Sequence, residues 1–122
     1  MTSGIGEDLL VRGLDDWVHL AEVAWVVKSA NTSANEHELV EESLKVIRGL
    51  LAEGFAEIGD VTDGGFFEWN VPIEVAIDRV WREWTGLDHD LLQGDVCWLA
   101  NTELGNERAQ EALRLREGRS DA

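Results

Sequence analysis

The sequence predicts a mainly helical α+β fold, with about four helices and a small antiparallel sheet of two or three strands. Three long segments repeat apolar residues every three or four positions, which is typical of helices that bury one face. Two short stretches lack that spacing and are typical of strands. The length of 122 residues suits one hydrophobic core, so we expect a single domain over residues 1–122, ordered over about residues 7–116.

The first predicted helix runs from about Asp15 to Ala30. Asp15 and Asp16 supply a cap and favourable negative charge at its amino end. Apolar positions cover most of its surface, so we expect this helix to lie at the centre of the core. These positions are Trp17, Leu20, Ala21, Val23, Ala24, Trp25 and Val27.

The second predicted helix begins at about Glu36, after a turn over residues 31–35 that is rich in capping residues. Apolar residues at helical spacing continue until Gly54 ends the run. Glutamates coat the outside, where their charge suits the amino end of the helix dipole. The apolar positions are Leu39, Val40, Leu44, Ile47, Leu50 and Leu51, and the glutamates are Glu36, Glu38, Glu41 and Glu42.

The second half of the chain predicts strands and helices in alternation. Residues 55–61 form a short strand, residues 63–65 a turn, and residues 66–69 a short strand or an anchored loop. Pro72 suits a first helical turn, and the third helix continues to about Gly86. After a loop over residues 88–94, we expect a second pairing strand at 95–100, a turn at 101–105, a final helix at 106–116 and frayed residues at 117–122.

The formal charge of −15 lies in one part of the chain. Residues 13–107 hold 20 acidic and five basic residues, whereas the two ends hold five of each. Such a field repels nucleic acid and anionic membranes and attracts a basic partner. We therefore expect a basic protein partner, and we regard nucleic acid and membranes as poor partners.

The sequence gives little support to catalysis or to a metal site. Neither Gly4-Ile5-Gly6 nor Gly64-Gly65 has the pattern of a phosphate-binding loop after a strand. A metal site would use His89 with Asp88 and Asp90, or His19 with His37, but this spacing is weak for ligands. We expect no metal, no cofactor and no enzymatic activity.

One cysteine, Cys97, permits no internal disulfide and lies in an apolar run, so we expect a buried thiol in a reducing compartment. The amino terminus lacks the pattern of a signal peptide, and no stretch is long and apolar enough to span a bilayer. We expect a cytoplasmic protein.

Six tryptophans are a large number for this length. Four of them fall on helical apolar stripes and are predicted core residues, whereas two lie beside acidic loops. An aromatic residue within an acidic rim can anchor a basic protein surface, although simple packing is the alternative. The predicted core residues are Trp17, Trp25, Trp81 and Trp84, and the two beside acidic loops are Trp69 and Trp98.

Part of the chain resembles a winged-helix domain. The text LVEESLKVIRGLLAEGF at residues 39–55, running into the strand, is similar to a recognition helix and first wing strand. The text CWLANTELG at residues 97–105 is similar to the returning wing strand and the start of the following helix. Two features depart from that family: a helix over residues 72–84 interrupts the wing, and the helix that would enter a major groove is rich in glutamate.

In general character the chain also resembles immunity proteins of bacterial toxin systems, which are small, acidic and cytoplasmic and cover the active site of a basic nuclease. The leading hypothesis is therefore an immunity- or antitoxin-like inhibitor that neutralises a basic toxin by electrostatically steered binding. Predicted partner-binding residues occupy loops that flank the third helix, and they are Asp60, Asp63, Glu68, Trp69, Asp88 and Asp90.

The alternative hypothesis is a winged-helix transcriptional regulator that binds DNA as a dimer. It requires Lys45, Arg48 and the arginine-rich carboxyl end to gather on one side. The oligomeric state stays open, because an apolar stripe can face its own chain or another.

Overall fold

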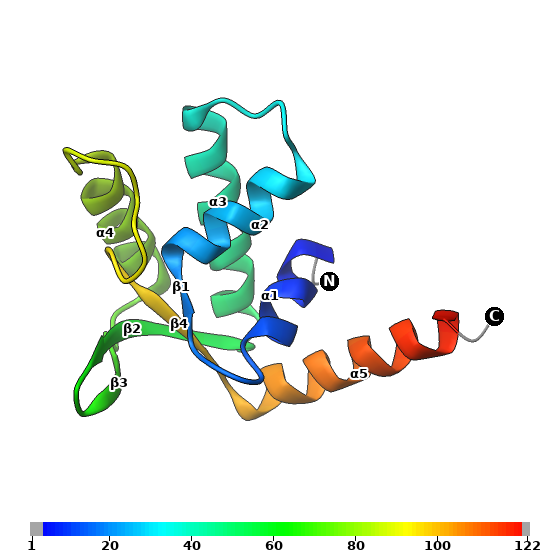
Figure 1. Cartoon of the computed structure of the whole chain (residues 1–122). Helices are drawn as coiled ribbons and strands as arrows, with labels where there is room; N and C mark the ends of the chain where they lie inside the picture. Colours follow the sequence, from blue (N-terminus) through cyan, green and yellow to red (C-terminus); the bar gives the residue numbers. More distant parts are fainter. Residues whose placement is uncertain (1–3, 121–122) are drawn as a thin grey trace.

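The computed structural model describes residues 4–120, with side chains through Glu117. It is an α+β fold of five helices and a four-stranded antiparallel sheet, which confirms the predicted fold class and adds one helix and at least one strand (Figure 1). In chain order the elements are α1 (Gly4–Arg12), β1 (Val18–His19), α2 (Leu20–Ala30), α3 (Glu36–Ala52), β2 (Ala56–Thr62), β3 (Gly65–Glu68), α4 (Ile73–Thr85), β4 (Trp98–Asn101) and α5 (Glu103–Ser120).

The sheet has the strand order β1-β4-β2-β3. Strands β2 and β4 pair with each other, with Ile58 opposite Leu99, although residues 63–97 lie between them in the chain. We call residues 63–97 the intervening segment, and we call residues 4–62 and 98–120 the body. The intervening segment therefore leaves the sheet after β2 and returns to it at the neighbouring strand β4. It contains strand β3, helix α4 and the loop before β4.

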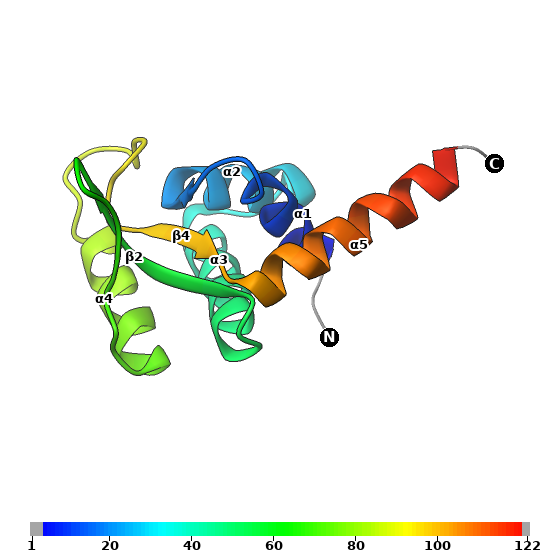
Figure 2. The same cartoon turned by 90° about the horizontal axis from the view of Figure 1, so that it is seen from below.

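The core lies between the helices and one face of the sheet. Three strands each direct a side chain to this face, from Val18, Ile58 and Leu99. These side chains belong to one buried cluster with Ile47 of α3. Helix α5 packs on α1, and its carboxyl end projects beyond the other elements (Figure 2). Gly105 permits this packing, because a Cβ atom there would lie 2.0 Å from the carbonyl oxygen of Phe55.

The predicted helix at residues 15–30 is wrong at its amino end. Helix α2 begins at Leu20, because Val18 pairs with Leu99 in the sheet and His19 caps the helix. The His19 Nδ1 atom accepts a hydrogen bond from the Glu22 N–H at 3.2 Å. Sheet pairing thus overrides the predicted helix at Val18 and His19. Helix α1 and strand β1 were not predicted from the sequence.

The second predicted helix is confirmed as α3, and its amino end carries a capping box. The Asn35 side chain accepts a hydrogen bond from the Glu38 N–H at 2.8 Å, and the Glu38 carboxylate accepts one from the Asn35 N–H at 3.1 Å. Gly54, with φ of +75°, follows the helix as predicted.

Strands β2 and β3 and helix α4 agree with the prediction to within two residues, but the last two elements differ more. Strand β4 begins at Trp98 rather than at residue 95, because Asp95 closes a turn and Val96 has a left-handed φ of +70°. Helix α5 begins at Glu103 and continues through Ser120, so residues 117–120 of the segment predicted to fray are helical. Residues 121–122 lie outside the described residues.

No helix within residues 4–120 combines the length and the apolar character that crossing a membrane requires.

Candidate functional site

The intervening segment concentrates negative charge. It holds eight acidic and two basic residues, a formal charge of −6 in 35 residues. Both of its arginines pair with carboxylates of their own helix: Arg79 with Glu83 and Arg82 with Asp78, each at 2.7 Å. The other carboxylates of the segment therefore have no cation of the segment to neutralise them.

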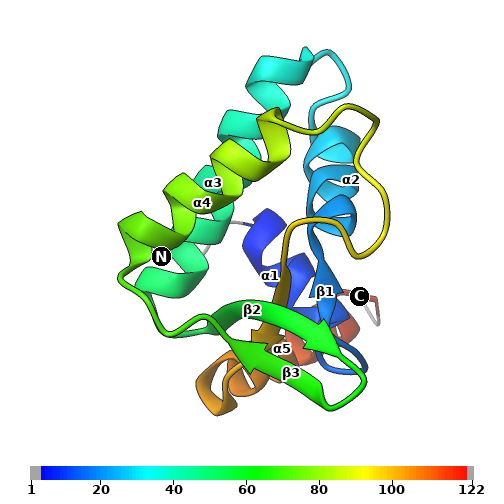
Figure 3. The same ribbon diagram turned by 90° about the vertical axis from the view of Figure 1, so that its left-hand side faces the viewer.

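The same segment also exposes apolar side chains. Five of the nine large hydrophobic residues exposed in the described part of the chain belong to it. Figure 3 looks onto α4, the β2–β3 hairpin and the loop after α4 together, so one side of the molecule carries all three. A surface that mixes exposed apolar groups with unpaired charge is typical of protein-binding sites. The five residues are Phe67, Val71, Val75, Trp81 and Leu92.

Two of the predicted partner-binding residues lie on the hairpin beside an exposed aromatic ring. Asp60 is opposite Phe67 in the β2–β3 register, and both are exposed. Asp63 lies in the turn at the hairpin tip and is also exposed. Neither aspartate forms an ion pair with a described lysine or arginine, so the hairpin offers free carboxylates next to Phe67.

Glu68 lies on the opposite face of the hairpin from Asp60, because it pairs with Gly59 in the register. Its carboxyl group hydrogen-bonds to that of Glu57, and this contact raises the pKa of Glu68 above the ordinary glutamate range. Slight burial and repulsion between the two carboxylates act in the same direction. Glu68 thus holds a proton more readily than an isolated glutamate.

Trp69 is a packing residue in the free protein rather than an exposed anchor. The Arg79 guanidinium lies over its indole ring, 3.8 Å from the ring centroid. The indole Nε1 atom is buried without a hydrogen-bond partner among the described residues. A binding partner would have to displace Arg79 to reach this ring.

The remaining two predicted residues, Asp88 and Asp90, lie exposed in the loop after α4. Between them, the His89 Nδ1 atom lies 2.7 Å from the Asp90 carbonyl oxygen, and this hydrogen bond raises the pKa of His89. The carboxylates of Asp95, Asp88 and Asp90 raise it further. The structure thus separates the six predicted residues into two groups, one on and directly after the β2–β3 hairpin and one in the loop after α4, and within the first group Glu68 and Asp60 lie on opposite faces of the hairpin.

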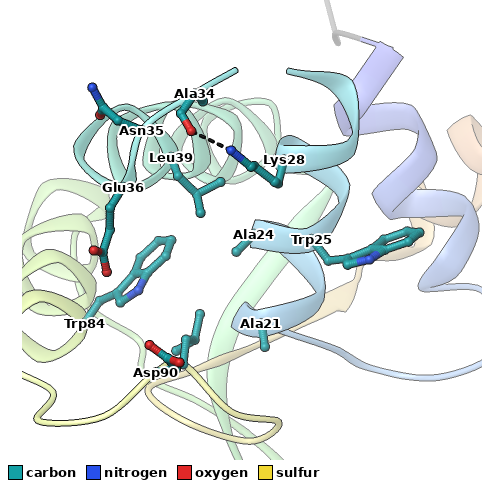
Figure 4. A pocket seen from close by; sticks show the side chains of 11 residues that line it. Ala21, Ala24, Trp25, Lys28, Ala34, Asn35, Glu36, Leu39, Trp84 and Asp90 are labelled. Carbon is teal, nitrogen blue, oxygen red and sulfur yellow. Dashed lines mark hydrogen bonds between the residues drawn. The ribbon is translucent and has the colours of Figure 1, made fainter. Parts of the chain in front are cut away.

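Asp90 also borders a cavity of about 500 Å³ between α2, the start of α3, the end of α4 and the loop. Figure 4 shows Ala21 and Ala24 of α2 on one side of this cavity and Trp84 of α4 on the other. Glu36 contributes a second carboxylate to its lining. The sequence analysis did not predict this cavity, because only folding brings these four elements together.

Three of the four tryptophans predicted for the core are exposed. Trp84 is 8% exposed, but Trp17, Trp25 and Trp81 are 39%, 60% and 46% exposed. Trp17 lies in a loop and packs on Phe66, with 6.3 Å between the ring centroids. Helical spacing placed all four on apolar stripes, but spacing does not tell which side of a helix the rest of the chain covers.

Arg48 of α3 and Arg108 of α5 form ion pairs with carboxylates of two different helices. Arg48 makes two hydrogen bonds to the Glu74 carboxylate of α4, at 2.9 and 2.8 Å. Arg108 of α5 pairs with Glu7 of α1. The charges of Arg48 and Arg108 are thus each matched by a carboxylate, Arg48 by one of α4 and Arg108 by one of α1.

Cys97 is buried, as predicted, and burial strongly raises the pKa of its thiol. Among the described residues, no three histidine, cysteine, aspartate or glutamate side chains come close enough together to hold a metal ion.

Comparisons of this chain with protein-family models, with curated proteins and with solved structures give no match.

Proposed function

We propose that this protein is an acidic protein-binding module, and most concretely an immunity- or antitoxin-like inhibitor that neutralises a basic, nuclease-type toxin in the cytoplasm. Binding is steered by charge, so its rate falls as salt rises. The proposal assigns no catalytic residue, metal or cofactor.

The observation that carries the proposal is the coincidence of exposed carboxylates and exposed apolar groups on two neighbouring elements, the β2–β3 hairpin and the loop after α4. We call the five carboxylates predicted for partner binding, Asp60, Asp63, Glu68, Asp88 and Asp90, the acidic surface. All five are exposed. Phe67 lies beside Asp60, and Leu92 follows Asp90 in the same loop, so the surface also offers apolar groups that binding could bury.

A winged-helix variant without DNA reading is the second part of the proposal. Its support is the pairing of β2 with β4 after α3, with α4 and β3 between these two strands in the chain. Binding to duplex DNA needs a basic face. Arg48 and Arg108 do not provide one, because Glu74 pairs with Arg48 and Glu7 pairs with Arg108. The regulator hypothesis therefore has no observation that favours it.

The test is a pull-down from source-organism lysate with the tagged full chain, at low and high salt, with and without nuclease treatment. We expect near-stoichiometric recovery of one basic protein, lost at high salt but not after nuclease treatment. If the recovered protein is a nuclease, the purified chain should inhibit its cleavage of plasmid DNA. Recovery of nucleic acid instead would contradict the proposal.

Two charge-matched variants locate the interface. One neutralises the acidic surface (Asp60→Asn, Asp63→Asn, Glu68→Gln, Asp88→Asn and Asp90→Asn), and the control neutralises five exposed acids elsewhere (Asp15→Asn, Glu41→Gln, Glu42→Gln, Glu107→Gln and Glu117→Gln). We expect the first to weaken binding by about tenfold or more and the control by about twofold. Equal losses in both would show that only net charge matters and would remove the assignment.

A further inference from the structure

We infer that the cavity between α2 and α4 receives an arginine side chain of the basic partner, and this inference rests on the proposed function. The cavity of about 500 Å³ is large enough for a side chain or a small ligand. Asp90, which belongs to the acidic surface, is part of its lining.

The cavity exists because α2 presents small side chains toward α4. Helices α2 and α4 both pack against α3, and the alanines Ala21 and Ala24 leave room opposite Trp84. Leu39 and Leu91 complete an apolar lining that suits the aliphatic stem of a long side chain. Figure 4 shows the Trp84 indole facing these alanines across the cavity.

Two carboxylates from different elements lie beside the Trp84 indole. Glu36 comes from the first turn of α3 and Asp90 from the loop after α4 (Figure 4). Both are exposed, and no described lysine or arginine forms an ion pair with either carboxylate. A cation entering the cavity could contact both carboxylates and the indole ring together.

The one cation in the lining is already engaged. The Lys28 Nζ atom donates a hydrogen bond to the Ala34 carbonyl oxygen at 2.6 Å, across the cavity from Asp90 (Figure 4). It therefore ties α2 to the start of α3 and does not neutralise Glu36 and Asp90. The two carboxylates outnumber the single cation, so the lining favours a positively charged occupant.

The loop that carries Asp90 is held in a defined shape. The Asp95 carboxylate accepts a hydrogen bond from the Leu92 N–H at 2.9 Å, and the Cys97 N–H donates one to the Asp95 carbonyl oxygen at 2.8 Å. Asp90 thus reaches the cavity from a fixed loop. Arginine fits this site better than lysine, because a planar guanidinium can stack on the indole and donate to a carboxylate at the same time.

The test titrates the ¹⁵N-labelled full chain with N-acetyl-arginine amide and follows the indole N–H signal of Trp84 by NMR. N-acetyl-citrulline amide has the same shape without the charge and is the matched probe. We expect saturable shifts at Trp84 and at residues 36, 39, 90 and 91 with the arginine probe, with affinity at least about fivefold weaker for the citrulline probe. No saturable shift at Trp84, or equal affinity for the two probes, would overturn the inference.

Variants with equal charge change make the test specific. Glu36→Gln with Asp90→Asn should weaken the arginine probe about fivefold, whereas Glu42→Gln with Glu107→Gln should leave it within about twofold. Ala21→Leu should block the cavity without changing charge. An unchanged affinity in Glu36→Gln with Asp90→Asn, or in folded Ala21→Leu, would place the probe elsewhere and overturn the inference.

The pull-down separates this inference from the proposed function. If the wild-type chain captures a basic protein and Ala21→Leu captures it equally well, the cavity is not part of the interface and only the inference fails. If the wild-type chain captures no basic protein, the proposed function fails, and the inference fails with it as a statement about the partner. Reduced capture by Ala21→Leu, with the probe titration intact in the wild type, supports both.

Discussion

The body and the intervening segment use charged and apolar side chains in different ways. In the body, most arginines connect elements: Arg12 bonds to Glu22 of α2, and Arg108 pairs with Glu7 of α1. In the segment, Arg79 and Arg82 pair within α4 only. The body thus uses its cations to join helices, whereas the segment leaves acids free to meet another molecule.

Apolar residues follow the same division. Buried residues such as Leu9, Val23 and Ile47 fill the body, whereas the segment contributes mainly one face of α4 to the core. Its other apolar groups, Phe67 and Leu92 among them, stay exposed. Packing contacts are therefore concentrated in the body and exposed apolar groups in the segment, and the contacts at their junction decide how tightly the segment is held.

The largest expected effect concerns Cys97, which is buried where the segment rejoins the sheet. We expect thiol labelling to be about 10³-fold slower in the folded than in the unfolded chain, or about 4 kcal/mol of opening free energy. Because one helix face anchors the acidic segment, this value should fall below the free energy of global unfolding from urea titration. Equal free energies of opening and of global unfolding would mean that body and segment open together, and would contradict the division between them.

The next effect contrasts two glycines. A Cβ atom on Gly59 would lie 2.1 Å from the carbonyl oxygen of Phe67, which is backbone and cannot move aside without shifting β3. A Cβ atom on Gly49 of α3 meets nothing within 4 Å. We expect Gly59→Ala to destabilise the chain by about 2–4 kcal/mol and Gly49→Ala to stabilise it by about 0.5–1 kcal/mol.

Urea denaturation of both variants measures this contrast. A neutral or stabilising Gly59→Ala would show that β3 is not held closely against β2 and would contradict the register of Gly59 with Glu68.

The helices with strong local signals were predictable from the sequence. Asn35 and Glu38 form a capping box, and the apolar spacing from Leu39 to Leu51 then fixes α3. The stripe of α4 behaved in the same way, since Ala76 and Trp84 are buried together. Local chemistry was sufficient at these elements because their tertiary contacts agree with it.

Other features depend on contacts that no local pattern contains. Val18 falls within the helix predicted for residues 15–30, but its pairing with Leu99, 81 residues later, makes it a strand residue. The cavity beside Trp84 needs Ala21, Glu36 and Asp90 from three other elements. The predicted binding residues share only their place in predicted loops beside the third helix. The sequence does not indicate that Trp69 lies beneath Arg79.

A smaller effect is expected for the ion pair between body and segment. Arg48 donates two hydrogen bonds to Glu74, but both side chains are largely exposed. A double-mutant cycle with Arg48→Gln and Glu74→Gln should give a coupling of about 0.5–1 kcal/mol in urea denaturation. The pair of Arg82 with Asp78 lies within α4 and is the control, with about 0.3 kcal/mol expected.

The labelling of Cys97 tells where this coupling acts. Breaking the Arg48–Glu74 pair should speed labelling, whereas breaking the pair within α4 should change it less, because only the first pair joins segment to body. The opposite order would mean that the helix end, not the junction, controls opening.

The smallest effect concerns Glu68, whose hydrogen bond to the Glu57 carboxyl group raises its pKa in the folded chain. A raised pKa means that the folded state holds the proton to higher pH than the unfolded state does. The stability from this group is therefore complete below the ordinary glutamate pKa of about 4.3 and is lost as pH rises through the raised value. Near pH 7 the two carboxylates repel each other, so Glu68→Gln should stabilise the chain there by less than about 0.5 kcal/mol, because the side chain is exposed.

Urea denaturation between pH 4 and pH 8 checks this, with Glu42→Gln on α3 as the control. If the stability gained by Glu68→Gln grows with pH, the negative charge of Glu68 destabilises the hairpin of the free protein. A cationic partner would then relieve this repulsion. A gain that shrinks with pH would reverse the sign and remove this argument for the acidic surface.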